Sequence, residues 1–285
     1  ILPLDKSQRF EKSTPASKLL NNIFPFYKNR RPAWLIRAGL LLYDLMGGRA
    51  ILPGTSKLDL SGVVEGKPLK KKYQKAFEYS DCWVEDSRLV VLNAKDAAML
   101  GAKIHVNTKV ISANRKNGLW RVETKNLATN EREVFLSKVL INAGGPWVSD
   151  LLLNVLRVNS SKKVRLVRGS HIVVSKMWSH EKSYFFQGKD GRIIFAIPYE
   201  TDFTLIGTTE IDHLDLNEKP KCTELEKNYL INFANQYFDP ELKVEDIVWT
   251  YSGLRPLQDT SEDNATAVTR DYSIRVNPVS YTHLT

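Results

Sequence analysis

The sequence predicts a mixed α/β (α+β) chain in two parts, and three observations lead to this prediction. Residues 139–145 form an apolar run that ends in two glycines, which is typical of a buried strand entering a tight turn. After residue 158, short strand-like segments alternate with turns, a pattern that favours an antiparallel sheet built from meanders. Apolar residues recur at the helical period within 33–46, 87–100 and 222–238. We therefore expect a strand–turn–helix part followed by an antiparallel part.

The composition indicates a folded chain. Its 285 residues suit one large domain or two ordinary ones, and the hydrophobic share of 42% is enough for a core. Cys82 and Cys222 lie far apart and lack the spacing of metal ligands, so we expect free thiols, a reducing compartment and no metal. The longest apolar stretch, 33–46, is interrupted by Arg37 and Asp44 and is shorter than the ~18–20 residues of a membrane span.

An excess of basic residues favours anionic partners. The formal net charge is +9 and the pI is about 9.4, with lysines crowded at 70–72 and 162–163. Such partners include nucleic acid, acidic lipid headgroups and phosphorylated metabolites. No nucleic-acid motif accompanies the charge, and aromatic residues are not interleaved with the basic runs. A nucleic-acid partner is therefore not expected.

Both ends of the sequence are unusual. The chain starts at Ile1 instead of methionine, and residues 279–285 break the preceding pattern. This heptapeptide resembles the translated read-through of a transposon-end sequencing adapter. We therefore expect a fragment with a non-native tail at 279–285, and we exclude that tail from fold reasoning.

The first part should hold two helices and a run of short strands. Residues 1–75 are irregular in composition around the helix near 33–46. Asp86 or Ser87 can cap the second helix, and Gly101 can end it. Asn117 and Gly118 form a strong tight-turn signal. The apolar face of the second helix is Leu89, Leu92, Met99 and Leu100, and the strands that follow are 103–106, 110–114, 119–124 and 133–136.

The second part should be a sheet with one helix. Thr223 and Glu226 have the spacing of a capping box at the start of the helix at 222–238. Apolar side chains of this helix line up at i+4 spacing, and they are Leu225, Tyr229, Phe233 and Tyr237. The predicted strands are 171–175, 183–187, 192–198, 203–208 and 247–254.

Two glycine-bearing turns could bring a backbone close to a ligand. Gly144 and Gly145 end the run at 139–145, and glycine permits such an approach. An ordinary strand-to-helix turn would have the same sequence. Gly207 offers the same freedom, and the hydroxyls of Thr208 and Thr209 could bond a ligand or only a turn. From these residues alone, both interpretations stay open.

Two side chains could carry acid–base or anion chemistry. His171 begins a predicted strand, and an imidazole titrates near neutrality, so it can act as a general base or be purely structural. Arg255 follows a predicted strand and precedes Pro256. A guanidinium keeps its charge and holds a carboxylate or phosphate through two parallel hydrogen bonds. A surface arginine at a strand end would look the same, so this alternative also stays open.

In their order and spacing, the segments of this chain resemble the aerobic, FAD-dependent glycerol-3-phosphate dehydrogenases. The resemblance covers about residues 25–275, nearly the whole chain. The segments that carry it are 31–34, 77–83 with Asp86, 88–90, 114–120, 142–148, 164–174, 192–198, 206–209, 246–257 and 269–272.

The resemblance implies an incomplete FAD-binding, Rossmann-like domain of the glutathione-reductase and D-amino-acid-oxidase type, with an antiparallel-sheet domain that caps the flavin. The implied FAD-binding part is 1–157, the substrate domain is 158–260, and 261–278 returns toward the FAD domain. The implied reaction converts sn-glycerol 3-phosphate to dihydroxyacetone phosphate, and electrons pass through FAD to a membrane quinone. The implied location is cytoplasmic, on an acidic lipid surface at the inner face of the bacterial plasma membrane, and a homodimer is one alternative for the full-length form.

The resemblance also implies roles for single residues. His171 would take the proton of the C2 hydroxyl as hydride leaves for the flavin. Arg255 would hold the phosphate or polarise the oxygen that becomes the ketone. The residues implied to contact FAD are Val110 near the adenine, Ala143, Gly144 and Gly145 near the phosphates or ribose with Trp147 beside them, and Thr208 and Thr209 at the flavin-side pocket.

The sequence also departs from the family pattern. It lacks the N-terminal Gly-x-Gly-x-x-Gly turn that cradles the FAD pyrophosphate, and it lacks the C-terminal flavin loop. We therefore expect this polypeptide by itself to bind FAD weakly or not at all, and to be inactive. Two alternatives remain open: a related amine or 2-hydroxy-acid oxidase on the same scaffold, and a non-catalytic basic module that binds acidic lipid or nucleic acid.

Overall fold

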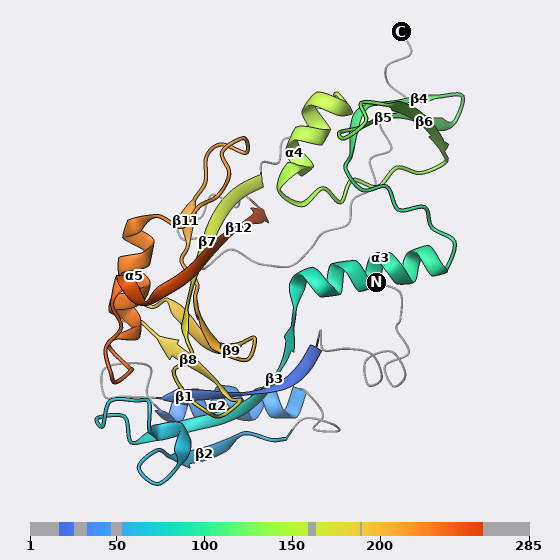
Figure 1. Ribbon diagram of the computed structural model, residues 1–285. Coiled ribbons are helices and arrows are strands. Elements are labelled where there is room, and N and C mark those ends of the chain that lie inside the picture. The colour runs from blue at the N-terminus through green and yellow to red at the C-terminus, as the bar shows by residue number, and fades with distance from the viewer. Residues whose placement is uncertain (1–16, 26–32, 47–52, 159–163, 189, 259–285) are drawn as a thin grey trace. The chain divides into compact units, whose positions relative to one another are not determined.

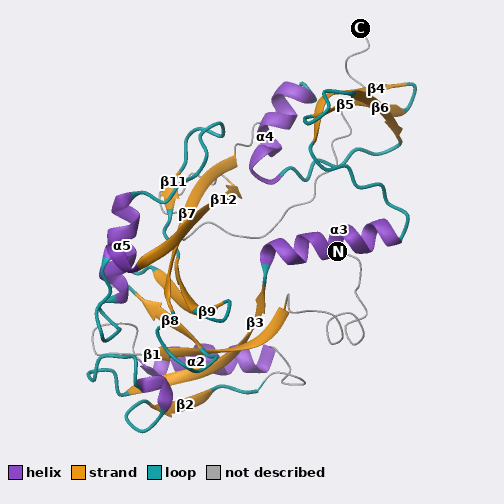
Figure 2. Ribbon diagram, in the orientation of Figure 1, coloured by secondary structure: helices purple, strands orange, loops and turns teal. Residues whose placement is uncertain are grey.

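The structure is a computed structural model that describes residues 17–25, 33–46, 53–158, 164–188 and 190–258. It contains helices and antiparallel strands, so the predicted mixed α/β class is confirmed (Figure 2). The chain divides into two compact units. The first unit is drawn from Ile1–Ala102, Gly169–Thr209 and Lys221–Ser252, and the second from Lys103–Arg168, Glu210–Pro220 and Gly253–Thr285. The functional domain boundaries expected at 157 and 260 stay a prediction.

A largely antiparallel sheet is the framework of the first unit (Figure 1). In spatial order its strands are β7 (Val164–Ser175), β10 (Phe203–Gly207), β9 (Ile193–Tyr199), β8 (Ser183–Gln187), β1 (Ser17–Pro25), β3 (Lys75–Val84) and β2 (Ser56–Asp59). β10 pairs antiparallel with β7 and β9, and β9 pairs antiparallel with β8, so the predicted meander is confirmed. β1 lies parallel to β8 and antiparallel to β3. β12 (Ile247–Gln258) pairs with β7, whose first residues belong to the second unit.

The helix predicted at 222–238 is shorter in the structure, where it is α5 (Glu224–Ala234). Its capping box is confirmed, since the Glu226 carboxylate accepts the Thr223 N–H at 2.9 Å and the Thr223 hydroxyl accepts the Glu226 N–H. The i+4 row of apolar residues that starts at Leu225 is buried only in part, because Leu225 is 82% exposed whereas Phe233 and Tyr237 are each 2% exposed. The capping box turns the next residue inward instead, so the buried residues of the helix are Glu226, Leu230, Ile231, Phe233 and Ala234.

The other two helices of the first unit are α2 (Ala33–Met46), at its predicted bounds, and α3 (Asp86–Met99). α3 starts after Glu85 without a side-chain cap, so the predicted cap by Asp86 or Ser87 is wrong. The chain leaves the helix through Gly101 at a φ of +96°, as predicted. The predicted apolar face is only partly confirmed. Leu89 and Leu92 are half-buried, whereas Met99 and Leu100, at the end of the helix, are exposed.

An aromatic core lies between α5 and the sheet. The Phe186 ring on β8 stacks on Tyr237, just after α5, with ring centroids 4.2 Å apart. Tyr184 and Phe238 meet edge to face in the same cluster. All four side chains are nearly inaccessible to solvent, and each such burial contributes about 1.5–3 kcal/mol. This core fixes α5 against the meander, and with it Glu226.

The second unit contains a three-stranded antiparallel sheet of β4 (Thr108–Lys116), β5 (Leu119–Asn126) and β6 (Arg132–Ser137). The turn between its first two strands is confirmed, because Asn117 and Gly118 have φ of 54° and 79°, as a tight hairpin requires. The strand predicted at 103–106 is wrong, since those residues form an irregular connection from α3 to β4. β11 (Ile211–Asp212) pairs with Val167 and Arg168 in the same unit.

The buried strand predicted at the start of 139–145 is also wrong. Val139 and Ile141 are 68% and 80% exposed, and the segment has no strand geometry. A strand needs a neighbour for its backbone hydrogen bonds, and no described strand pairs with this segment. The helical turns predicted after it are confirmed: a 3₁₀ turn at Gly145–Trp147, α4 (Val148–Asp150) and a π turn at Leu151–Val155.

Some predictions concern residues outside the described ranges. These are the lysines at 162–163, the return segment at 261–278 and the tail at 279–285. Cys82 and Cys222, which are described, form no disulfide. Within the described ranges, no helix is both long enough and apolar enough to cross a membrane.

Candidate functional site

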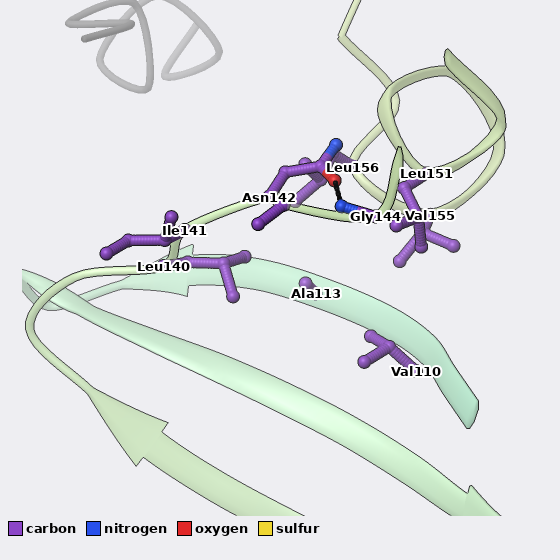
Figure 3. Close-up of a pocket in the computed structure, with 10 residues that line it drawn as sticks. Val110, Ala113, Leu140, Ile141, Asn142, Gly144, Leu151, Val155 and Leu156 are labelled. Carbon is purple, nitrogen blue, oxygen red and sulfur yellow. Dashed lines mark hydrogen bonds between the residues drawn. The ribbon is translucent and has the colours of Figure 1, made fainter. Parts of the chain in front are cut away.

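A small hollow in the second unit brings together three of the predicted cofactor-contacting residues, Val110, Ala143 and Gly144 (Figure 3). Its volume is about 180 Å³. One wall is the β4 strand with Val110 and Ala113, and the opposite wall comes from the helical turns that follow Gly145. The remaining lining residues are Leu140, Ile141, Asn142, Leu151, Val155 and Leu156.

The turn beside this hollow is held by Asn142. Its side-chain oxygen accepts the Gly144 N–H at 3.2 Å, and its amide donates to the Val148 carbonyl at 3.1 Å (Figure 3). A Cβ at Gly144 would lie 2.7 Å from Leu151 Cδ1, so any larger residue here would have to displace the end of that side chain. Gly145 has a φ of +55°, a second position that favours glycine.

The hollow is small for a whole ligand. Pockets that enclose whole cofactors or drug-sized ligands usually measure ~300–1,000 Å³, so this hollow could hold only one flat, largely apolar portion of a larger molecule. The backbone N–H of Gly144 already donates to Asn142, so it offers a phosphate no donor in this arrangement. Trp147, predicted beside it, is 54% exposed on the adjoining turn.

In the first unit, His171 lies on β7 directly opposite Gly207 of β10. Its imidazole stacks on the Tyr251 ring of β12, with centroids 4.7 Å apart and the planes 9° from parallel. Burial raises the pKa of Tyr251 to about 12, with smaller contributions from Tyr199 and Asp86, so its phenol stays protonated near neutral pH. The imidazole therefore has a neutral aromatic partner on one face.

Gly207 leaves room for this imidazole. A Cβ built at Gly207 would overlap the His171 ring, whereas a Cβ at Gly253 of β12 would meet nothing within 4 Å. We expect Gly207→Ala to destabilise the fold by ~1–3 kcal/mol through overpacking, and Gly253→Ala to stay within about 0.5 kcal/mol of wild type. Denaturant unfolding of both variants measures the difference. Equal stability of the two variants would contradict the close packing of His171 on Gly207.

Thr208 and Thr209 follow Gly207 in the same unit. The Thr209 side chain is 1% exposed, donates to Glu226 Oε1 at 2.7 Å and accepts the Ser170 N–H at 2.9 Å. The Thr208 hydroxyl donates to the Thr209 carbonyl at 3.1 Å. The Thr209 hydroxyl thus serves internal bonding, and the predicted contact of these two residues with the flavin stays a prediction.

Arg255 belongs to the second unit and lies within β12, which continues to Gln258. The predicted end of that strand at residue 254 is therefore wrong, because pairing of β12 with β7 extends it. Nη1 of Arg255 lies 3.5 Å from Oε1 of Glu210, and the arginine side chain keeps 32% of its exposure. A guanidinium carries five N–H donors in a planar fork, so it can contact a glutamate on one side and an anion on another.

The sequence interpretation missed Tyr251, Ser170, Ser252 and the tertiary role of Glu226. Tyr251 and Ser252 lie in the run around Arg255, but nothing in that run shows that they face His171 and Ser170. Glu226 was found only as part of a capping box, since its other partners are 17 and 56 residues away. A local motif cannot report such contacts.

Glu226 is a buried, ionised group of this site. Burial by itself would raise the pKa of its carboxyl, but hydrogen bonds from the Thr223 backbone and from the Ser170, Thr209 and Thr223 hydroxyls hold that pKa below its ordinary value. A depressed folded-state pKa means that this group stabilises the fold above the ordinary value of 4.5 and that the contribution is lost as pH falls through the lower, folded-state pKa.

Below pH 4.5, we expect the free energy of unfolding to fall less steeply with decreasing pH in Glu226→Gln than in the wild type, because the variant has no carboxylate to protonate at this position. Denaturant unfolding at a series of pH values measures it. Glu224→Gln is the matched control, since this side chain is 72% exposed on the same turn, and it should follow the wild-type pH dependence. An unchanged pH dependence in Glu226→Gln would contradict the assignment.

The family model described as "DAO: FAD dependent oxidoreductase" matches residues 22–274 of this chain. The chain belongs to the FAD dependent oxidoreductase family. The match covers both described units, including the hollow at Gly144 and the strand that carries His171. The prediction of a flavin-dependent oxidoreductase with FAD as its cofactor is confirmed at the level of this family.

Among the relatives of this family member, the D-erythritol 1-phosphate dehydrogenase of Brucella abortus is 50% identical over 250 residues, which are 88% of this chain and 50% of that protein. The aerobic glycerol-3-phosphate dehydrogenase of Escherichia coli is 40% identical over 253 residues, 89% of this chain and 50% of that protein. The chain spans about half the length of the curated relatives it matches. The predicted resemblance to glycerol-3-phosphate dehydrogenases is confirmed.

A solved structure agrees with this family assignment. The glycerol-3-phosphate dehydrogenase of Bacillus halodurans, solved in complex with FAD, superposes with a TM-score of 0.69 at 25% identity. The match covers 87% of this chain and 45% of that protein.

Proposed function

We propose that the full-length protein oxidises the secondary alcohol of a phosphorylated polyol, with glycerol 3-phosphate as the first candidate and dihydroxyacetone phosphate as its product. The observation that carries this proposal is the His171 imidazole, held on β7 between the glycine opposite and the Tyr251 ring. Such a group can accept the proton of a hydroxyl. Bound FAD would supply the hydride acceptor for the hydrogen on the same carbon.

Arg255 supplies the fixed positive charge that this substrate class needs. A phosphate monoester or a developing alkoxide is stabilised by a guanidinium in a partly buried setting. Glu210 on its other side limits how far the side chain can turn. We infer that Arg255 binds the phosphate or polarises the oxygen that becomes the ketone.

Val110, Ala143 and Gly144 would hold part of FAD, since they line the hollow that suits the adenine, and the turn at Gly145 and Trp147 adjoins it. We also assign Thr208 and Thr209 to FAD binding, as residues that would border the flavin. We assign the FAD-binding role to 1–157 and the substrate role to 158–260.

A second candidate substrate is D-erythritol 1-phosphate. The relative named for that substrate is 50% identical to this chain, against 40% for the Escherichia coli glycerol-3-phosphate dehydrogenase. Both compounds are phosphate monoesters with a secondary hydroxyl, so the roles of His171 and Arg255 are the same for each. The difference between them is the length of the polyol, so the substrate-binding region must accommodate a longer carbon chain for D-erythritol 1-phosphate.

The test is a substrate panel with the purified full-length protein loaded with FAD. Bleaching of the flavin absorbance under anaerobic conditions measures reduction by each substrate. We expect reduction by glycerol 3-phosphate or D-erythritol 1-phosphate and none by the dephosphorylated polyols. Reduction by amino acids or 2-hydroxy acids instead would favour the alternative oxidase, and no reduction by any substrate would favour a non-catalytic basic module.

We further propose that the protein passes its electrons to a membrane quinone while bound peripherally to an acidic lipid surface, at the cytoplasmic face of the membrane. The net charge of +9 favours such a surface. α2 also exposes Trp34, Leu45 and Met46, at 71%, 68% and 80%, and Lys28, Arg30 and Arg31 precede this helix in the sequence. Co-sedimentation with vesicles of anionic or neutral lipid across a salt series tests this binding. Sedimentation velocity tests the homodimer.

A further inference from the structure

Glu226 divides its two carboxylate oxygens between two tasks. Oε2 accepts the Thr223 N–H at 2.9 Å and the Thr223 hydroxyl at 2.8 Å, which closes the capping box of α5. Oε1 accepts the hydroxyls of Ser170 and Thr209, each at 2.7 Å. The first task is local to the helix. The second ties the helix to residues of β7 and of the segment after β10, and helix capping does not require it.

The bonding at Oε1 continues into β12. The Ser170 and Ser252 hydroxyl oxygens are 2.7 Å apart. A serine hydroxyl has one proton, and that of Ser170 goes to Glu226, so Ser252 is the donor of this second bond. The result is a directed chain from Ser252 through Ser170 to the Glu226 carboxylate. Thr209 reinforces it by accepting the Ser170 N–H.

Each of the two serines in this hydrogen-bonded chain is next in sequence to one member of the aromatic stack. Ser170 immediately precedes His171, and Ser252 immediately follows Tyr251. The His171 and Tyr251 rings stack at 4.7 Å. The carboxylate therefore anchors the backbone of both strands at the point where they present these two rings. All of these residues lie in the first unit.

The setting makes this anchor strong. Glu226 is 2% exposed and Ser170 is fully buried, so water does not compete for these hydrogen bonds. Hydrogen bonds to an ionised acceptor are shorter and about twice as strong as neutral ones. Two such bonds, one from Ser170 of β7 and one from Thr209 in the segment after β10, restrain the strand pair that carries His171 and Gly207.

We propose that Glu226 is a positioning residue, which sets the place and tilt of the His171 imidazole through Ser170, Thr209 and Ser252. Its effect on the reaction rests on the proposed role of His171 as general base, whereas its effect on the His171–Tyr251 stack does not. Misplacement of a reacting group by about 1 Å can lower a rate ~100-fold. Glu226 thus couples the start of α5 to the proposed catalytic base.

Two variants separate positioning from capping. Glu226→Gln keeps the capping-box pattern, because glutamine can also occupy that position, but it places an amide where one carboxylate oxygen accepted two hydroxyls. Thr223→Ala is the matched control, since it removes the hydroxyl bond to Oε2, keeps the backbone N–H bond to the same oxygen and leaves the bonds to Oε1. Ser252→Ala removes only the hydrogen bond between Ser252 and Ser170. If Glu226→Gln fails to fold, this variant tests the positioning role in its place.

The measurement is the NMR spectrum of the full-length protein labelled at histidine Cε1, with His171→Ala identifying the His171 signal among those of the other histidines. Stacking on Tyr251 shifts this signal, so its position reports the stack. We expect Glu226→Gln and Ser252→Ala to move it and Thr223→Ala to leave it near the wild-type position. An unmoved signal in both of the first two variants would overturn the proposal.

Kinetics provide the second readout. We expect Glu226→Gln to lower the rate constant of flavin reduction at saturating substrate by about 10- to 100-fold with little change in substrate affinity. Thr223→Ala should stay within about twofold, because it spares the bonds that position the strand. If Glu226→Gln moves the NMR signal of His171 but no phosphorylated polyol reduces the flavin of the wild-type protein, the proposed substrate is wrong and the positioning role of Glu226 is retained. A moved signal with wild-type kinetics in Glu226→Gln would overturn the link to catalysis.

Discussion

Replacing His171 with alanine is expected to lower the turnover of the full-length, FAD-loaded protein by ~10²–10⁴-fold, the usual contribution of a general base. The structure supports this group because its ring is restrained by the stack on Tyr251 and by the close approach of β10 at Gly207. Such restraint keeps a base in one orientation toward a hydroxyl. Stopped-flow reduction of the flavin by the best substrate of the panel measures the effect.

The control for His171 is His105, whose side chain is 39% exposed in the second unit. His105→Ala should reduce the flavin at the wild-type rate. Imidazole added to the medium should restore part of the activity of His171→Ala, since a free base can occupy the space left by the side chain. Near-normal turnover of His171→Ala, with the fold intact by denaturant unfolding, would refute the base role.

Replacing Arg255 with alanine is expected to lower kcat/KM by ~10²–10³-fold, as the loss of one charge-stabilising donor does in other enzymes. The substitution also leaves Glu210, which is 16% exposed, without this cation. Arg255→Lys should recover only part of the activity, because an ammonium keeps the charge but cannot form two parallel hydrogen bonds. Steady-state kinetics with a phosphorylated and a dephosphorylated polyol measure the effect.

The matched control for Arg255 is Arg132, which also pairs with a glutamate in the second unit. Its Nη1 lies 3.2 Å from Glu123, but its side chain is 66% exposed on β6. Arg132→Ala should leave the kinetics unchanged. If the two alanine variants behave alike, the effect of Arg255 comes from the loss of an ion pair or of general charge, and the anion-binding role is wrong.

The sequence was a good guide wherever a local pattern was sufficient. The alternating strands from β8 to β10, the hairpin at Asn117 and Gly118, and the capping box of α5 all follow from neighbours along the chain. Each is specified by contacts within a few residues, and such contacts are visible in a sequence. The family followed from long motifs in order.

The errors arose where a partner outside the segment decides the outcome. The run at 139–145 has the apolar residues of a buried strand, yet Val139 and Ile141 are exposed because no described strand pairs with them. Leu225 has the spacing of a core residue, but the core meets α5 one position later. Burial depends on what packs against a residue, and periodicity does not contain that information.

The class of this protein follows from its sequence: an FAD-dependent oxidoreductase chain with a basic charge, His171 on a strand of an antiparallel sheet and Arg255 after a later strand. How these residues are held depends on the tertiary structure. His171 stacks on Tyr251, Arg255 lies beside Glu210 within β12, and one oxygen of Glu226 binds both Ser170 and Thr209. The reason is that each of these contacts joins residues 17 to 80 positions apart, and only the pairing of strands and the packing of side chains bring such residues together.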